Sequence, residues 1–435
     1  MYNSFIVAEP VFNFPHGLKN NIIYKKESLR IKYLYTKSYG VAEKDIHDKS
    51  DIEQLNNLVT TAYIPYLQYC CQGNQPLVKT LGNTNIQIAH GGIQQGMNDI
   101  NTTLNIKYTE FITNLPGEPL DRSALKANKL MGPSFYTDGF DVNISSQLKA
   151  AEIQTYVNLA DTPAPEAIYK ITGCATEYNG PIWTRFWQLN NNSSKNVLIG
   201  ICGHAPLGKL PMVYQNNLCC DTTYANNGNP NERPPMSIRA ELNSNECWKV
   251  DITLNEPVTA KFDSEDGSED LNITSYCIHE NNMTLAEIPQ DVEDGKKLYQ
   301  HFVGETMING TTYSIWRTAK SAVVDNDVKF WRIPPDYILK IPSELTSSGV
   351  QDVDKEVFHI ITDIEGNLDF FEKSLSMCHD GKLVLLGDIW DRGTVDQELK
   401  ISDIIQHHKP ICVVGNRDAN KARWILELYN DFDWE

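Results

Sequence analysis

One local pattern recurs five times along the chain: a short run of apolar residues stops at a polar turn that contains glycine. The runs are EVFHII, KLVLL and PICVV near the C-terminal end, and NIQIA and NVLIGI in the N-terminal half. Continuous apolar runs bounded by glycine turns are typical of strands that are buried on both faces of a sheet. The pattern therefore predicts a set of buried strands, each followed by a polar loop.

Helical patterns follow the three C-terminal runs. NLDFFEKSLSMC follows the first, VDQELKISDIIQHH the second and ANKARWILELYNDF the third. A strand, a loop and a helix repeated in this order indicate a parallel α/β sheet. In such sheets the functional side chains collect on the loops at the carboxyl ends of the strands. All five polar turns lie at such ends, so we expect a functional site there.

The remaining patterns are simpler. Residues 51–80 predict a helix that stops at Gly73, and residues 146–160 predict a second helix. Alternating segments between about 236 and 335 indicate a β-rich region. Residues 341–356 have the Pro, Ser and Gly content of a linker.

Composition limits the classes of function. The chain has 41% hydrophobic residues and no apolar stretch of the roughly 18–20 residues that a membrane-spanning helix needs. Its first residues do not resemble a secretory signal, so we expect a cytoplasmic protein whose ten cysteines are reduced. The net charge of -18 argues against sequence-independent binding to nucleic acid. The net charge does not exclude a phosphorylated substrate, because binding one needs only a local cluster of cationic side chains.

The C-terminal turns carry oxygen-rich side chains. Asp363 and Glu365 follow the first run, Asp388 closes the second and Asn416 the third. Three carboxylates on adjacent strand ends would repel one another unless cations lay among them. Oxygen-rich clusters of this kind suit hard or borderline divalent metals. These turns therefore predict a metal site.

The motif order TDIEG, GDIWDRG and GNRD resembles the first three motifs of the calcineurin-like metallophosphoesterases. The DRG ending resembles the phosphoprotein phosphatase branch of that family. There, an Asp-x-His, a Gly-Asp and a Gly-Asn motif supply most of the ligands to two metals. The spacings of 25 residues from Asp363 to Asp388 and of 28 from Asp388 to Asn416 fit one βα unit each.

The family pattern needs two more histidines, and none follows Asn416. The matching contexts stand in the N-terminal half, where IAHGG contains His90 and ICGH contains His204. A motif order of four, five, one, two, three is what a circular permutation would give. The resemblance thus implies an α/β fold: a metallophosphoesterase-type β-sandwich flanked by helices, with a circularly permuted motif order and an extra β-rich region.

The permutation divides the chain into three parts. Residues 1–235 would form the N-terminal half of a phosphoesterase domain and residues 346–435 its C-terminal half. Residues 236–345 would be the β-rich segment and linker. The alternatives are a fragment, or two incomplete domains that pair in trans.

The resemblance also implies roles for single residues. One ion would be bound by Asp363, Glu365 and Asp388, and the second by Asp388, Asn416, His90 and His204. Two such ions activate a water and clamp phosphate oxygens for attack. Arg392 and Asn416 would bind the substrate phosphate, Arg392 through a bidentate contact. A salt bridge between Arg392 and Asp391 is the alternative. The expected catalytic residues are Asp391, Arg392, Arg417 and Asp418.

Two positions depart from the family pattern. Glu365 stands where the family has histidine, which favours Mn(II), or Mg(II), over zinc or iron. Arg417 and Asp418 replace the His-Glu pair after Asn416, and that histidine is the family's general acid. Arg417 cannot donate a proton near neutral pH, but it could stabilise charge in the transition state. Because a phenolic leaving group depends less on an acid, the sequence favours phosphotyrosine or aryl phosphates.

The sequence therefore predicts a metal-dependent phosphatase that hydrolyses phosphomonoesters, with phosphorylated proteins as substrates and neither nucleic acid nor membrane as a partner. One alternative is a hydrolase of nucleotide polyphosphates, similar to the diadenosine-tetraphosphatase-like enzymes. The other is a non-catalytic scaffold that keeps its metal site for folding.

Overall fold

The computed structural model of the protein describes residues 57–82, 86–92, 105–106, 108–109, 112–113, 180–183, 199–205, 208–214, 216–222, 233–243, 248–279, 288–293, 296–320, 323–324, 327–328, 336–342, 355–390, 393–419 and 421–422. The helix predicted at 146–160 lies outside these residues, as do Asp391 and Arg392 and most of the predicted linker.

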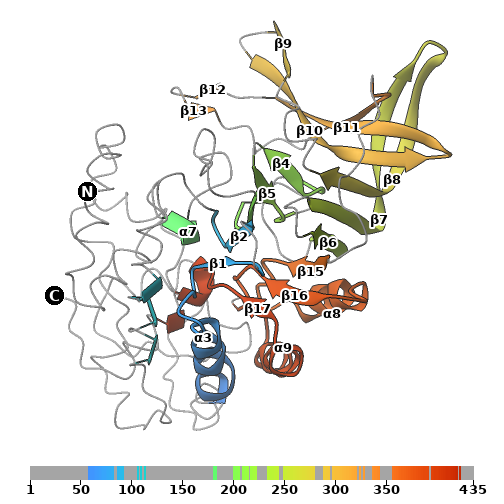
Figure 1. The fold of residues 1–435 in the computed structure, drawn as a ribbon. Helices are drawn as coiled ribbons and strands as arrows, with labels where there is room; N and C mark the ends of the chain where they lie inside the picture. Colours follow the sequence, from blue (N-terminus) through green and yellow to red (C-terminus); the bar gives the residue numbers. More distant parts are fainter. Residues whose placement is uncertain are drawn as a thin grey trace, which may run out of the picture.

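Most of the described strands belong to two sheets (Figure 1). The smaller sheet contains β1 (Val78–Thr80), β2 (Ile86–Ala89), β3 (Ile199–Cys202), β4 (Met212–Tyr214) and β5 (Asn217–Cys219). The larger contains β6 (Met236–Leu242), β7 (Trp248–Ser264), β8 (Gly267–His279), β9 (Ile288–Glu293), β10 (Lys296–Ile308), β11 (Thr311–Lys320), β14 (Asp336–Lys340), β15 (Glu356–Ile361), β16 (Lys382–Leu385) and β17 (Ile411–Cys412). The strands β12 (Val323–Val324) and β13 (Asp327–Val328) pair only with each other.

Parallel pairing occurs where the apolar runs predicted it. In the larger sheet β15, β16 and β17 are parallel neighbours, and in the smaller sheet β2, β3 and β5 are parallel neighbours. The helices α8 (Leu368–Ser376) and α9 (Val395–His408) connect the three C-terminal strands. The chain is therefore a mixed α/β protein, and the predicted strand and helix order is confirmed for the described residues.

Local sequence fixes the helix ends. A capping box between Thr394 and Gln397 begins α9, and the Asn367 side chain accepts a hydrogen bond from the Phe370 amide at the start of α8. The helical segment η2 (Leu58–Tyr63) and α3 (Ile64–Cys70) runs into a turn in which Gly73 has a φ of 77°. The predicted helix is thus confirmed over Leu58–Cys70; it ends before Gly73, and Val78–Thr80 form β1 instead.

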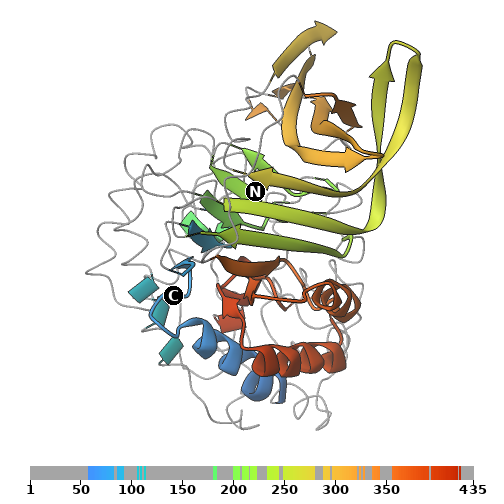
Figure 2. The same ribbon diagram turned by 45° about the vertical axis from the view of Figure 1, so that its right-hand side comes forward.

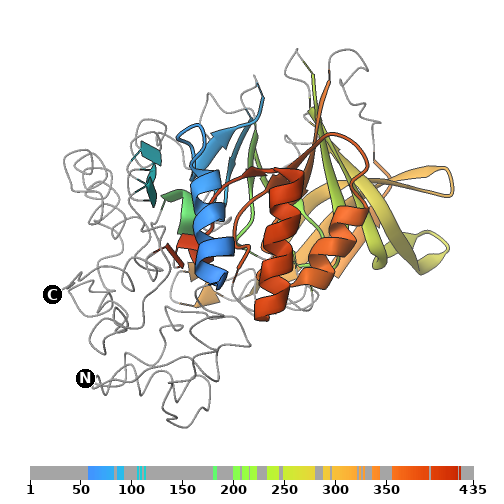
Figure 3. The same cartoon turned by 90° about the horizontal axis from the view of Figure 1, so that it is seen from below.

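The central strands are buried on both faces, because their side chains alternate between two cores. Phe358 and Ile360 of β15 pack in one core with Ile88 and Ile201 of the smaller sheet. Ile361 of β15 points the other way, into a core formed with the helices. Figure 3 shows α3, α9 and α8 side by side over one face of the larger sheet. The layers are thus helices, larger sheet and smaller sheet.

The predicted β-rich region is confirmed, but the domain boundary at 235/236 is not where the structure changes. The strand β6 pairs with β15, with Ala240 opposite Phe358, so the larger sheet continues across the predicted boundary. Its neighbour β7 is long enough to pair with β6 in the central sheet and, further along, with β14. A register shift between Thr253 and Val258, at Pro257, marks the point where β7 leaves the central sheet.

Beyond this shift the strands close into a barrel. The strands β7, β8, β10, β11 and β14 pair in sequence, and β14 pairs back onto β7 in parallel, with Ile338 opposite Lys261. Figure 2 shows the barrel strands at one end of the molecule, away from the helices. The barrel therefore grows directly out of the sheet that carries β15, β16 and β17.

Candidate metal centre

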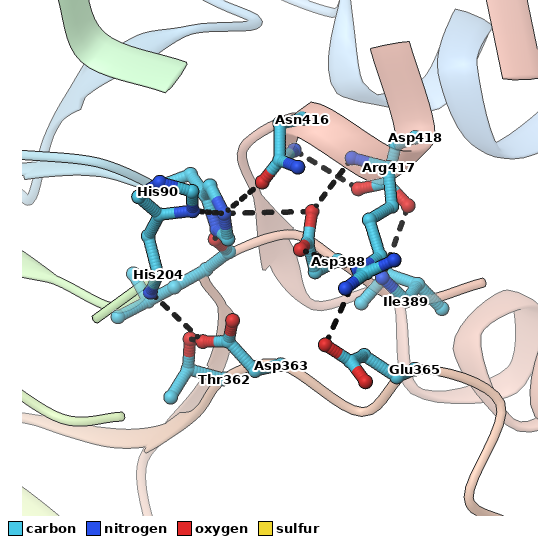
Figure 4. A network of polar contacts seen from close by, with 12 residues as sticks. His90, His204, Thr362, Asp363, Glu365, Asp388, Ile389, Asn416, Arg417 and Asp418 are labelled. Atoms are coloured by element: carbon cyan, nitrogen blue, oxygen red, sulfur yellow. Dashed lines mark hydrogen bonds and ion pairs between the residues drawn. The ribbon is translucent and has the colours of Figure 1, made fainter. Parts of the chain in front are cut away.

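The structure brings together the six residues that the sequence predicts as metal ligands (Figure 4). They come from the carboxyl ends of five strands that lie in two sheets: His90 follows β2, His204 follows β3, Asp363 and Glu365 follow β15, Asp388 follows β16 and Asn416 follows β17. His90 and Asn416 are 326 positions apart, yet His90 Nε2 lies 2.9 Å from Asn416 Oδ1. The fold therefore brings together the motifs that the sequence divides between two parts of the chain.

We call His90, His204, Asp388 and Asn416 the histidine half of the centre. The Nδ1 atom of His90 donates to the Leu386 carbonyl oxygen at 2.8 Å, which leaves Nε2 of the neutral ring as an acceptor. Around Nε2 lie Asn416 Oδ1 at 2.9 Å, His204 Nδ1 at 3.2 Å and Asp388 Oδ1 at 3.4 Å. These are ligand atoms that a metal can use, so the donor set fits a divalent metal.

We call Asp363, Glu365 and Asp388 the carboxylate half. Each of these buried side chains offers an oxygen within 4.8 Å of the others. Burial raises the pKa of Asp388 to about 7, although His90 lowers it, and the neighbouring carboxylate of Asp363 raises it further. Ionised carboxylates packed this closely are costly without a compensating positive charge. The carboxylate half therefore also requires compensating positive charge.

Backbone strain marks the same residues. The φ angles of His204, Asp363, Glu365 and Asp388 are 66°, 50°, 47° and 51°. L-residues rarely adopt this left-handed region, and such residues cluster at functional sites. The other described non-glycine residues with positive φ are at turns or a helix end: Asn74, Asn309 and Lys409. Four of the six predicted ligands thus hold a strained conformation.

Two motif glycines are required by close packing at the centre. A Cβ atom on Gly203 would lie within 3.0 Å of the side chains of Thr362 and Asp363. A Cβ atom on Gly415 would lie within 3.0 Å of both the carboxylate and the backbone nitrogen of Asp388. The glycine turns therefore allow neighbouring strand ends to approach the ligands directly.

Replacing Gly415 by alanine should weaken Mn(II) binding by about 10- to 100-fold, in the range found for residues that orient metal ligands. The added methyl group must displace Asp388, which both halves share. Titration calorimetry with Mn(II) measures the affinity. Gly310→Ala is the control: Gly310 lies in a turn with a φ of 83°, and no atom lies within 4 Å of its Cβ position. Equal Mn(II) affinity in both variants would contradict the packing argument.

Arg233 is a member of the centre that sequence reasoning missed. Its Nη1 donates to the Asp363 carbonyl oxygen, and its Nη2 lies 3.5 Å from Glu365 Oε1 and 3.8 Å from Asp363 Oδ1. Its Nε lies 3.3 Å from Asp221 Oδ1. Although burial opposes it, Asp221 and Glu365 hold the pKa of Arg233 above its ordinary value. No motif marks Arg233, which stands in the segment NERPPM. Its partner Asp221 has a weak sequence signal, because it begins the segment DTT after His204.

Two of the predicted catalytic residues, Arg417 and Asp418, lie among the described residues. Arg417 lies at the centre, with Nε 3.2 Å from Glu365 Oε1 and 3.5 Å from Asp388 Oδ2. The two oxygens of Asp418 accept hydrogen bonds from the amides of Ile389 and Gly415. It is fully buried, and burial raises its pKa to about 6. Asp418 therefore holds two strand-end loops in place.

Comparisons with protein-family models, with curated proteins and with solved structures found no match to this chain. Among the described residues, no helix is long and apolar enough to cross a membrane. The interpretation of the centre therefore depends on its own geometry.

Proposed function

We propose that this protein is a metal-dependent phosphoesterase that hydrolyses phosphomonoesters. One observation carries the proposal: Asn416 Oδ1, His204 Nδ1 and Asp388 Oδ1 lie 2.9–3.4 Å from the Nε2 atom of His90. Such a set of neutral and anionic metal-donor atoms suits a divalent ion. A phosphate ester is the substrate class that a buried divalent ion next to arginines would suit.

The donor set indicates which metal would bind. Imidazole, carboxylate and amide donors together suit Mn(II), and the number of carboxylates favours Mn(II) or Mg(II) over zinc or iron. When bound, the metal would supply Lewis-acid stabilisation of the phosphoryl group and a nucleophilic water at neutral pH. His90 is oriented for ligation by the Leu386 carbonyl, which fixes its tautomer.

The placement of the motifs supports a circularly permuted metallophosphoesterase. His90 and His204 follow strands of the smaller sheet, whereas the DIEG, GDIW and GNRD turns follow strands of the larger sheet. The two sheets share one hydrophobic core, which supports the sandwich that we propose from the motif order. The placement of the motifs at the strand ends supports this fold whatever the order of the motifs along the chain.

The substrate we propose is a phosphorylated protein, with aryl esters such as phosphotyrosine preferred. Hydrolysis breaks the bond between phosphorus and the leaving oxygen, which must then take up a proton. The Arg417 guanidinium cannot release one near neutral pH, but it can stabilise negative charge on the phosphoryl group. Rates on matched phosphotyrosine and phosphoserine peptides test this, and a strong preference for phosphoserine would contradict it.

Hydrolysis of p-nitrophenyl phosphate tests the proposed function itself. We expect purified protein to hydrolyse this ester when Mn(II) is added, and a chelator to abolish the activity, because the metal supplies the main stabilisation of the phosphoryl group. Adding Mn(II) in excess of the chelator should restore it. Protein that binds Mn(II) but hydrolyses neither p-nitrophenyl phosphate nor phosphopeptides would instead be a metal-binding scaffold.

A further inference from the structure

The side chain of Arg417 lies inside the metal centre. Its Nε atom is 3.2 Å from Glu365 Oε1 and 3.5 Å from Asp388 Oδ2, and the side chain is only 13% exposed. Its backbone amide donates to Asp388 Oδ1 at 2.9 Å. Arg417 is thus fixed to Asp388 at both ends, and its charge is placed between two of the three residues of the carboxylate half.

A second guanidinium faces the remaining carboxylate. Arg233 Nη2 lies 3.8 Å from Asp363 Oδ1 and 3.5 Å from Glu365 Oε1. Every residue of the carboxylate half therefore has a guanidinium nitrogen within 4.0 Å. An arginine stays protonated at any pH near neutrality, so these charges cannot be given up to admit a metal.

Guanidiniums offset part of the negative charge of the carboxylate half without an ion. Asp363, Glu365 and Asp388 carry three negative charges when ionised and face the two positive charges of Arg233 and Arg417, although Arg233 also pairs with Asp221. A divalent ion there would compete with both guanidiniums for the same oxygens and be repelled by them. The oxygens are close enough to ligate a metal, but guanidinium nitrogens already lie within 4.0 Å of each of these carboxylates.

The histidine half differs in this respect. Besides the shared Asp388, its donors are the neutral side chains of His90, His204 and Asn416. The Arg417 guanidinium contacts Asp388 through Oδ2, whereas His90 Nε2 faces Oδ1 of the same carboxylate. The two oxygens of Asp388 thus point to different cationic positions, one of which is already occupied by arginine.

We propose, on the basis of the metal-dependent function proposed for this protein, that the centre holds a single divalent ion in its histidine half and that the Arg417 guanidinium takes the place of a second ion. This revises the sequence prediction of two ions. Glu365 and Arg417, the two positions that depart from the family pattern, are then partners in one ion pair. A fixed guanidinium can bind phosphate oxygens and stabilise transition-state charge.

Metal stoichiometry tests the proposal without relying on activity. Wild-type protein and Arg417→Ala are saturated with Mn(II), freed of excess metal and analysed by elemental mass spectrometry. We expect one Mn(II) per chain in the wild type and two in Arg417→Ala, because removal of the guanidinium leaves the three carboxylates to a second ion. Arg239→Ala is the matched control and should keep one ion, since Arg239 pairs with Glu241 and Asp380 elsewhere on the sheet.

The electron paramagnetic resonance spectrum of bound Mn(II) gives a second readout. We expect an isolated ion in the wild type and an exchange-coupled pair in Arg417→Ala. If that variant does not fold, the closer replacement Arg417→Gln takes its place. Two ions in the wild type would overturn this inference and leave the proposed function standing, as would one ion in both the wild type and a folded Arg417 variant. Protein that binds no Mn(II) would overturn the proposed function itself.

Discussion

Replacing Asp388 by asparagine should reduce the Mn(II)-dependent hydrolysis of p-nitrophenyl phosphate by more than about 100-fold, since even residues that only orient metal ligands cost about 10- to 100-fold. Asp388 is the one carboxylate that faces both halves of the centre. Its Oδ1 lies near His90 Nε2 and its Oδ2 near the Arg417 guanidinium. Asparagine keeps the shape of the side chain but removes the charge on which both cationic positions depend.

The same substitution should not destabilise the metal-free protein. Asparagine retains an oxygen that can accept the hydrogen bond from the Arg417 amide, and it removes one of several buried, mutually repelling carboxylates. Urea denaturation in the presence of a chelator measures this. The control is Asp369→Asn on α8, where the side chain is 74% exposed and pairs with Lys373; activity there should be unchanged. Full activity in Asp388→Asn would contradict the proposed centre.

Much of the site follows from the sequence because its residues are set by local constraints. An apolar run followed by a glycine turn places the next polar residue at a strand end, and this holds for all five strands that carry ligands. Gly203 and Gly415 are needed because a Cβ atom at either position would clash with Asp363 or Asp388. The strained φ angles at Asp363 and Asp388 are the local result of the same turns.

What the sequence could not predict depends on contacts between distant segments. Arg233 precedes β6, and only the pairing of β6 with β15 brings it beside Glu365. Asp418 follows a metal-ligand motif, so a catalytic role was the natural prediction, yet the Ile389 amide comes from another strand end. The sequence likewise did not predict that the larger sheet continues across 235/236, since β-strand patterns do not reveal which strands pair.

Replacing Arg233 by methionine should lower the free energy of unfolding by about 3–5 kcal/mol, the usual cost of removing one partner from a buried ion pair. Arg233 is 6% exposed and lies within 4.0 Å of Asp221, Asp363 and Glu365. Without it, Asp221 stays buried next to carboxylates, which already raise its pKa together with burial. Denaturation by urea in a chelating buffer measures the loss without a contribution from bound metal.

A double-mutant cycle separates this ion pair from simple loss of packing. Because removing both partners of a buried pair costs far less than removing one, Asp221→Asn combined with Arg233→Met should be more stable than the sum of the single changes predicts. The matched control is Arg239→Met. That arginine also pairs with two carboxylates, but its side chain is 23% exposed and that of its partner Asp380 is 54% exposed. We therefore expect Arg239→Met to lower the free energy of unfolding by only about 0–1 kcal/mol. Additive effects in the cycle, or equal losses at Arg233 and Arg239, would mean that Arg233 contributes packing and not the charge that the carboxylates of the centre require.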